Sequence, residues 1–187
     1  MTEPVAESGD GTAVVEDPST RTRILAATVE ALGRSGHAKL SLKEVAMHAG
    51  VSRPTLYRWF ASKEELLTAF GLYERDMFAN GLARATSGLD RVEKLDAALR
   101  FIVEYQQSYS GARLVDVEPE AAVAQLAEVL PVMRAGLQRL ISGPNAAVKA
   151  AVAVRVAVSQ YIVRSDDANQ FLAQLRHAVG IKLSGTI

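Results

Sequence analysis

A chain of 187 residues, nearly half of them apolar, is long enough to bury a hydrophobic core, and its 21 basic and 21 acidic side chains balance. The absence of cysteine excludes disulfides, thiol catalysis and thiolate metal sites. No apolar run approaches the roughly 20 residues of a membrane span, and the acidic start lacks the basic and apolar stretches of a secretory signal. We therefore expect a cytoplasmic protein without membrane contact.

The charge is distributed unevenly along the chain. Residues 1–18 carry five acidic and no basic side chains and show no apolar period, which predicts a disordered acidic tail. Residues 19–67 carry eight basic and four acidic side chains, whereas the remainder is nearly balanced. Such a block is typical of a surface that meets a polyanion, although chance clustering explains the charge alone equally well.

Two helices are predicted at the start of this basic block. Ser19 or Thr20 caps the first, whose apolar residues recur at three-to-four spacing until Gly36 ends it. Residues 41–44 (SLKE) have the form of a capping box, in which the serine oxygen accepts from the glutamate N–H and the glutamate reaches back. They predict a short helix that runs to Gly50.

Two further helices complete the N-terminal part. Ser52 caps the third helix, with Pro54 in the first turn, where the missing N–H costs nothing, and the helix ends near Phe60. A second capping box at residues 62–65 (SKEE) opens a long helix that runs through Met77.

The second half of the chain also has a helical pattern. One helix covers about residues 91–109, residues 110–111 break it, and residues 115–119 form a short irregular or helical connection. Pro119 suits a helix start, and Pro131 is expected to end or kink the helix that contains it. After a break at 142–145, the last two helices cover 146–164 and 167–183. No stretch alternates with period two for long enough to suggest a sheet, so the predicted fold class is all-α.

Residues 42–60 have the anatomy of a helix-turn-helix. The small Ala46 lets the first helix pack closely under the second, and Gly50 tolerates the positive φ of a tight turn, which Val51 plugs. Leu56 and Phe60, four residues apart, form the inward seam of the second helix. A small residue and a glycine alone fit an ordinary helical hairpin, but their combination with the caps, the seam and the basic charge favours DNA recognition.

The face of the second helix opposite this seam carries the candidate DNA contacts. Arginine pairs with guanine through two hydrogen bonds, and threonine or tyrosine contacts phosphate or a thymine methyl. Lysines beside the motif and the free N–H groups at the helix starts suit phosphate. The predicted contacts are Ser41, Lys43, Ser52, Arg53, Pro54, Thr55, Tyr57, Arg58 and Lys63.

The order of these motifs resembles the DNA-binding domain of the TetR (tetracycline repressor) family over about a quarter of the chain. The likeness runs through ILAA at 24–27, SLKEVA at 41–46, AGVS at 49–52, TLYRWF at 55–60 and KEELL at 63–67. It implies three N-terminal DNA-binding helices, here residues 19–67, and a helical regulatory and dimerisation domain, here residues 68–187. It also implies a repressor that binds a palindromic operator as a dimer and leaves it when a small-molecule effector binds. Trp59 departs from the histidine often found at its position.

The penultimate helix points to a homodimer. Residues 146–163 are apolar on almost every face, whereas a surface helix shows a polar stripe. Packing within one chain is one explanation. Since a chain of this size has little room for a fully interior helix, we predict a dimer interface formed by helices 146–164 and 167–183 across a two-fold axis.

An effector pocket is predicted among aromatic and apolar residues of the second half. Tyrosines provide apolar walls with hydrogen-bonding tips, as ligand pockets tend to have, although aromatic residues at helical spacing are also ordinary core residues. The candidates favour an apolar or aromatic effector over a highly charged one. They are Tyr73, Met77, Phe101, Tyr105, Tyr109, Met133, Leu137 and Tyr161.

Other classes of function find less support in the sequence. His37, His48 and His177 do not stand at metal-ligand spacing, and no nucleophile elbow, P-loop or dinucleotide fingerprint is present. We therefore expect no catalysis, metal or cofactor. The remaining alternative is a helix-turn-helix protein that regulates through protein contacts without specific DNA binding, which gives no reason for a basic reading face.

Overall fold

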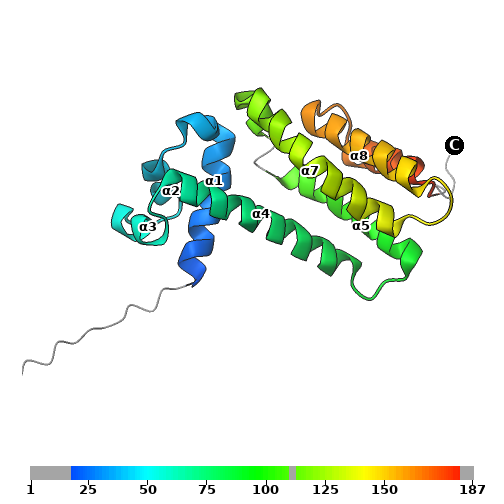
Figure 1. Cartoon of the computed structure of the whole chain (residues 1–187), viewed down its shortest axis with the longest axis horizontal. Helices are drawn as coiled ribbons and strands as arrows, with labels where there is room; N and C mark the ends of the chain where they lie inside the picture. The colour runs from blue at the N-terminus through cyan, green and yellow to red at the C-terminus, as the bar shows by residue number, and fades with distance from the viewer. Residues whose placement is uncertain (1–17, 110–112, 182–187) are drawn as a thin grey trace, which may run out of the picture.

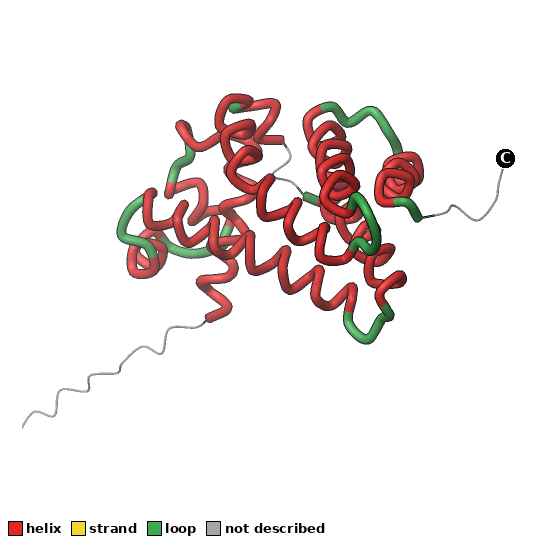
Figure 2. Tube along the Cα trace, turned by 45° about the vertical axis from the view of Figure 1, so that its right-hand side comes forward, coloured by secondary structure: helices red, strands yellow, loops and turns green. Residues whose placement is uncertain are grey.

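The computed structural model describes residues 18–109 and 113–181, and the described residues are helices joined by short loops, without strands (Figures 1 and 2). They form α1 (Pro18–Lys39), α2 (Leu42–His48), α3 (Arg53–Trp59), α4 (Lys63–Thr86), α5 (Arg91–Ser108), α6 (Leu114–Val117), α7 (Pro119–Leu140), α8 (Ala146–Ile162) and α9 (Ala168–Val179). The all-α prediction is confirmed. The predicted tail at 1–18 lies outside the described residues, apart from Pro18.

The first three helices and the start of α4 enclose one hydrophobic core. Ile24 and Leu25 of α1, Val45 of α2, Leu56 of α3 and Leu66 of α4 are all fully buried in it. Each helix therefore contributes at least one completely desolvated side chain, and these contacts fix the helix-turn-helix on α1 and α4 as one unit. We call this unit the reading head (residues 18–70).

A second core lies among α5, α7, α8 and α9. Leu99 of α5, Ala150 of α8, and Phe171 and Leu175 of α9 are at most 1% exposed there. The long helix α4 leaves the reading head and runs to α5, against which it packs (Figure 1). Phe70 still belongs to the first core, so α4 passes without interruption through the predicted domain boundary at residues 67–68.

Two predicted features of the N-terminal helices differ in the structure. Gly36 has φ 70° and ψ 176°, which interrupts α1, but helical residues resume and α1 ends at Lys39. Ser41 makes no capping hydrogen bond, so the first capping box is wrong. The second is confirmed in part: the Ser62 hydroxyl accepts from the N–H of Glu65 at 3.1 Å, while the Glu65 carboxylate accepts from Ala61 instead of Ser62.

The C-terminal helices end earlier than predicted at two points. Pro131, which was expected to end or kink its helix, does not end α7, which continues to Leu140; Pro131 and Ala127 are both exposed, so water can satisfy the Ala127 carbonyl that loses its N–H partner. α8 ends at Ile162, two residues early. α9 stops at Val179 because Gly180 adopts φ 84° and its N–H bonds back to Arg176 and His177. No described helix is both long enough and apolar enough to span a bilayer.

Candidate nucleic-acid interface

The turn between α2 and α3 has the predicted construction. Gly50 adopts φ 64°, and the N–H of Val51 donates to the carbonyl of Ala46 at 3.0 Å. Ala46 is 2% exposed, so its small side chain allows the close packing of the two helices. Leu56 and Phe60 are 0% and 2% exposed, which confirms them as the inward seam of α3.

The start of α3 is fixed by a side-chain cap. The Ser52 hydroxyl accepts from the N–H of Thr55 at 3.2 Å, and the two hydroxyls share a hydrogen bond of 2.8 Å. Pro54 occupies the first turn, where it removes no helical hydrogen bond. Ser52 and Thr55 therefore satisfy each other, and both hydroxyls keep acceptor capacity at the N-terminal end of the helix.

Most of the predicted contact residues are exposed in the structure. Pro54 and Arg58 are exposed on the side of α3 opposite the buried seam, Tyr57 is exposed beside them, Arg53 is exposed at the helix N-terminus, and Thr55 is half-buried. Ser41, which precedes α2, and Lys43 of α2 are exposed as well. We call the α3 residues 53, 54, 57 and 58 the reading face. It presents two guanidinium groups and a phenol on a short, rigid helix, a set that can pair with base edges and phosphates.

Lys63 lies in a different setting from the other predicted contacts. Its side chain is half-buried, and its ammonium group donates to the carbonyl of Ala38 at 3.1 Å. This bond ties the start of α4 to the end of α1. Lys63 therefore supports the reading head in this structure, and a phosphate contact would require the ammonium group to leave or share this carbonyl.

Two arginines of α1 support the motif, and sequence reasoning counted them only as charge. The Arg23 guanidinium donates to the carbonyls of Ala49 and Gly50 at 3.2–3.3 Å. The guanidinium of Arg21 lies 5.7 Å from the centre of the Phe60 ring. Carbonyls at a helix C-terminus lack intrahelical partners, so a fork-shaped donor one helix away is a good partner for them. The only sequence signal for these roles was the presence of basic residues on α1, which precedes the turn at Gly50.

The predicted effector residues are spread over several settings. Leu137 belongs to the second core, Met133 packs against that core, and Tyr73 packs against the first. Met77 is 45% exposed on α4. Phe101, Tyr105 and Tyr109 form an aromatic cluster with Phe78, with neighbouring ring centroids 5.1–5.9 Å apart.

A carboxylate that the sequence prediction missed lies beside this aromatic cluster. Glu74 of α4 accepts a hydrogen bond of 3.4 Å from the Tyr105 hydroxyl. Burial raises the pKa of Glu74, against the hydrogen bonds from Tyr109 and Tyr105, which lower it. Burial and the negative charge of Glu74 also raise the pKa of both tyrosines. The aromatic rings of this cluster therefore lie beside one partly buried carboxylate.

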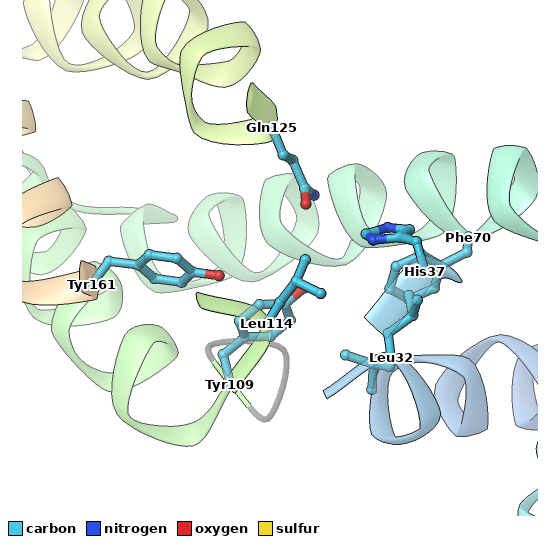
Figure 3. Close-up of a pocket in the computed structure, with 8 residues that line it drawn as sticks. Leu32, His37, Phe70, Tyr109, Leu114, Gln125 and Tyr161 are labelled. Atoms are coloured by element: carbon cyan, nitrogen blue, oxygen red, sulfur yellow. The ribbon is translucent and has the colours of Figure 1, made fainter. Parts of the chain in front are cut away.

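A small cavity lies between the reading head and the helices that follow it. Tyr109 and Tyr161 are the two predicted effector residues that line it, together with Val29, Leu32, His37, Phe70, Leu114 and Gln125 (Figure 3). Figure 3 shows the Tyr161 hydroxyl and the Gln125 amide both directed into it. Its volume of about 10 Å³ holds about one water molecule, so a larger ligand would require the walls to move. Within residues 18–109 and 113–181, no acidic or histidine cluster could hold a metal ion.

Comparison with known proteins agrees with this geometry. Residues 24–70 match the family model described as bacterial regulatory proteins, tetR family. The HTH-type transcriptional regulator UidR of Escherichia coli K12 is 32% identical over 103 residues, 55% of this chain and 51% of UidR. The HTH-type transcriptional repressor LfrR of Mycolicibacterium smegmatis is 35% identical over 108 residues, 57% of this chain and 50% of LfrR. The matched region spans about half the length of these curated relatives.

Solved structures extend the likeness to most of the described chain. A TetR-like transcriptional regulator from Rhodococcus sp. RHA1 superposes with a TM-score of 0.67 at 19% identity, covering 86% of this chain and 93% of that one. The fatty acid degradation regulator FadR from Bacillus halodurans gives a TM-score of 0.63 at 17% identity, with coverages of 84% and 96%. At these identities the solved structures establish the fold, whereas the family match assigns residues 24–70 to the tetR family of bacterial regulatory proteins.

Proposed function

We propose that this protein is a sequence-specific transcriptional regulator that inserts α3 into the major groove of DNA. The observation that carries the proposal is the exposed reading face, held on a capped helix whose opposite side is buried in the first core. A helix-turn-helix reads base edges with the N-terminal residues of its second helix, which is where Arg53 and Pro54 lie. Residues 19–67 form the DNA-binding part and residues 68–187 the regulatory part, in a cytoplasmic protein with access to the chromosome.

The proposal includes a homodimer formed by the last two helices, residues 146–164 and 167–183. The buried face of α8 is made of Ala150, Ala153, Val154 and Ala157, and the first part of its outer face also carries apolar side chains, before the exposed Arg155 and Ser159. Val148 is 60% exposed and Val152, one turn later, is 43% exposed. A second copy across a two-fold axis would cover these valines and present two reading heads to a palindrome.

Repression with release by an effector is the mode of regulation that we propose. A small molecule that entered beside Tyr109 and Tyr161 would have to enlarge the cavity and so displace α4, α6 or α8. Because α4 continues into the reading head, such a movement would change the separation of the two α3 helices. The aromatic lining favours an apolar or aromatic effector. The relative LfrR is named a repressor, which supports the same sign of regulation here.

The alternative is a helix-turn-helix protein that regulates through protein contacts without specific DNA binding. One experiment separates the two: the purified full-length protein selects fragments from genomic DNA at near-physiological salt, and the enriched fragments are footprinted. The proposal predicts a protected palindrome with two half-sites. Enrichment no greater than that of random DNA, with inducer-free protein refolded from denaturant, would support the alternative.

A further inference from the structure

One side chain of the regulatory part forms hydrogen bonds directly with the reading head. The Glu118 carboxylate accepts from the N–H of His37 at 2.7 Å and from the N–H of Ala38 at 2.8 Å, and it lies 3.1 Å from the His37 imidazole Nδ1. Glu118 immediately precedes α7, so these hydrogen bonds join residues that are 80 and 81 positions apart in the chain. Its side chain is only 20% exposed.

These hydrogen bonds use backbone groups that α1 itself leaves without partners. Gly36 breaks α1, so the N–H groups of His37 and Ala38 open a new helical turn and need an acceptor. An Asp or Ser next to them in sequence would be the usual cap, but here the acceptor comes from another part of the fold. These N–H groups, Ala38 first, hold the pKa of Glu118 below its usual range, as expected for a carboxylate that is bonded as an anion.

Gly36 is required at this contact for two reasons. Its φ of 70° with ψ of 176° is a conformation that other residues rarely adopt. In addition, a Cβ at this position would overlap the side chain of Glu118. The break in α1 and the approach of the carboxylate therefore depend on the same residue. Gly36 leaves space for the Glu118 side chain, and that carboxylate caps the helical turn that begins at His37.

The position of this contact matters for the orientation of the reading head. The head is connected covalently to the regulatory part through α4, and α1 also packs against α6. Glu118 adds hydrogen bonds at the C-terminal end of α1, so the head is held there by directional polar contacts as well as by packing. Hydrogen bonds are directional, so they restrict the orientation of the head more narrowly than apolar packing alone.

We propose that Glu118 is a positioning residue for DNA recognition, which fixes the reading head on the regulatory part and so sets the separation of the two α3 helices in the dimer. This inference rests on the proposed function. It assigns Glu118 no contact with DNA. A change in the cavity could also reach the head through this contact, because His37 both bonds to Glu118 and lines the cavity.

The test compares Glu118→Ala with Glu120→Ala, a matched loss of one exposed carboxylate in the same helical turn. Each full-length variant is titrated with the selected palindrome, with the same palindrome lengthened by one or two base pairs between half-sites, and with a single half-site. Hydrogen exchange of residues 37 and 38 is measured in parallel. Glu118→Gln, which keeps an acceptor oxygen without the charge, is measured in the same way, and its changes should have the same direction as those of Glu118→Ala and be smaller.

The proposal predicts faster exchange at residues 37 and 38 and an affinity for the natural palindrome that is lower by about tenfold, the effect of one charged hydrogen bond. The preference for natural over lengthened spacing should shrink, while half-site affinity changes less than twofold and Glu120→Ala behaves as wild type. Faster exchange with unchanged affinity and spacing preference would overturn the proposal and reduce Glu118 to a helix cap. Wild-type protein without any palindrome preference would overturn the proposed function, and this inference with it.

Discussion

The guanidinium of Arg23 on α1 donates two hydrogen bonds to the carbonyl of Ala49, at 3.2 and 3.3 Å, directly behind the turn of the helix-turn-helix. This places a cation at the C-terminal end of α2, where its charge also complements the helix dipole. The arginine therefore holds the turn against α1 and keeps the angle between α2 and α3.

Replacement of this arginine should weaken DNA recognition through geometry. Arg23→Lys keeps the charge but loses the fork, so we expect specific affinity to fall by about 1.5 kcal/mol, roughly tenfold. The slope of affinity against salt concentration should not change, because no phosphate contact is lost. Fluorescence anisotropy titrations at several salt concentrations measure both, with Arg139→Lys on α7 as the control. A shallower slope would instead show that Arg23 contacts phosphate.

The two lysines predicted to contact phosphate should behave differently from each other. Lys43 is exposed on α2, so Lys43→Ala should weaken binding to specific and random DNA alike and reduce the salt slope by about one. Lys63 donates to Ala38, so Lys63→Ala should mainly lower the free energy of unfolding, by about 1 kcal/mol. Urea unfolding and salt-dependent titrations of both variants separate the two roles. Equal salt slopes for both variants would contradict this assignment.

The core residues of the reading head could be predicted from sequence because the relevant signals are local. Leu56 and Phe60 are four residues apart, and Ser52 stands directly before the helix it caps, so period and position determine the reading face. The end of α1 could not be predicted in the same way. Gly36 signals a helix end, but the acceptor that lets helical residues resume is Glu118, which is remote in sequence.

The same distinction explains the other differences. Ser41 has the sequence of a cap, yet no capping hydrogen bond forms, and the nearby Glu44 instead lies 3.9 Å from His48. Lys63 reads as a free cation, because its partner is a backbone carbonyl of another helix. Aromatic spacing singled out Tyr109 and Tyr161 together with core residues such as Leu137, because helical period alone does not distinguish a cavity wall from a core.

The ion pair between α5 and α9 predicts a pH dependence of stability. Arg176 donates to both carboxylate oxygens of Asp96, at 2.6 and 2.9 Å, and these hydrogen bonds hold the pKa of Asp96 below its usual value. A depressed folded-state pKa stabilises the protein above the unfolded value of about 3.9, and the contribution is lost as pH falls through the folded-state pKa. Asp96→Asn should cost roughly 1.5–3 kcal/mol at pH 7 in urea unfolding. A cost that persisted unchanged at pH 3 would contradict this account.

Glu74 should give a pH dependence of stability opposite in sign to that of Asp96. Burial raises its pKa, so the folded state binds a proton more readily than the unfolded state, and stability is lost as pH rises through the folded-state pKa. Glu74→Gln keeps an acceptor for Tyr105 without the charge and should therefore be more stable than wild type at pH 7. At pH 4 the two proteins should differ little. Thermal unfolding across this range measures the difference, and a variant less stable than wild type at pH 7 would refute the account.

The central claim, that the reading face of α3 recognises DNA sequence, is tested most directly by measuring discrimination between the selected palindrome and a scrambled duplex. The comparison uses wild type, Arg53→Ala/Arg58→Ala, and the control Arg134→Ala/Arg139→Ala, which removes two exposed arginines at the same spacing from α7. Specific sites bind at least about 10³-fold more tightly than random DNA. We predict that wild type and the control keep such a ratio and that the α3 variant loses most of it. Equal ratios in all three proteins would contradict the claim.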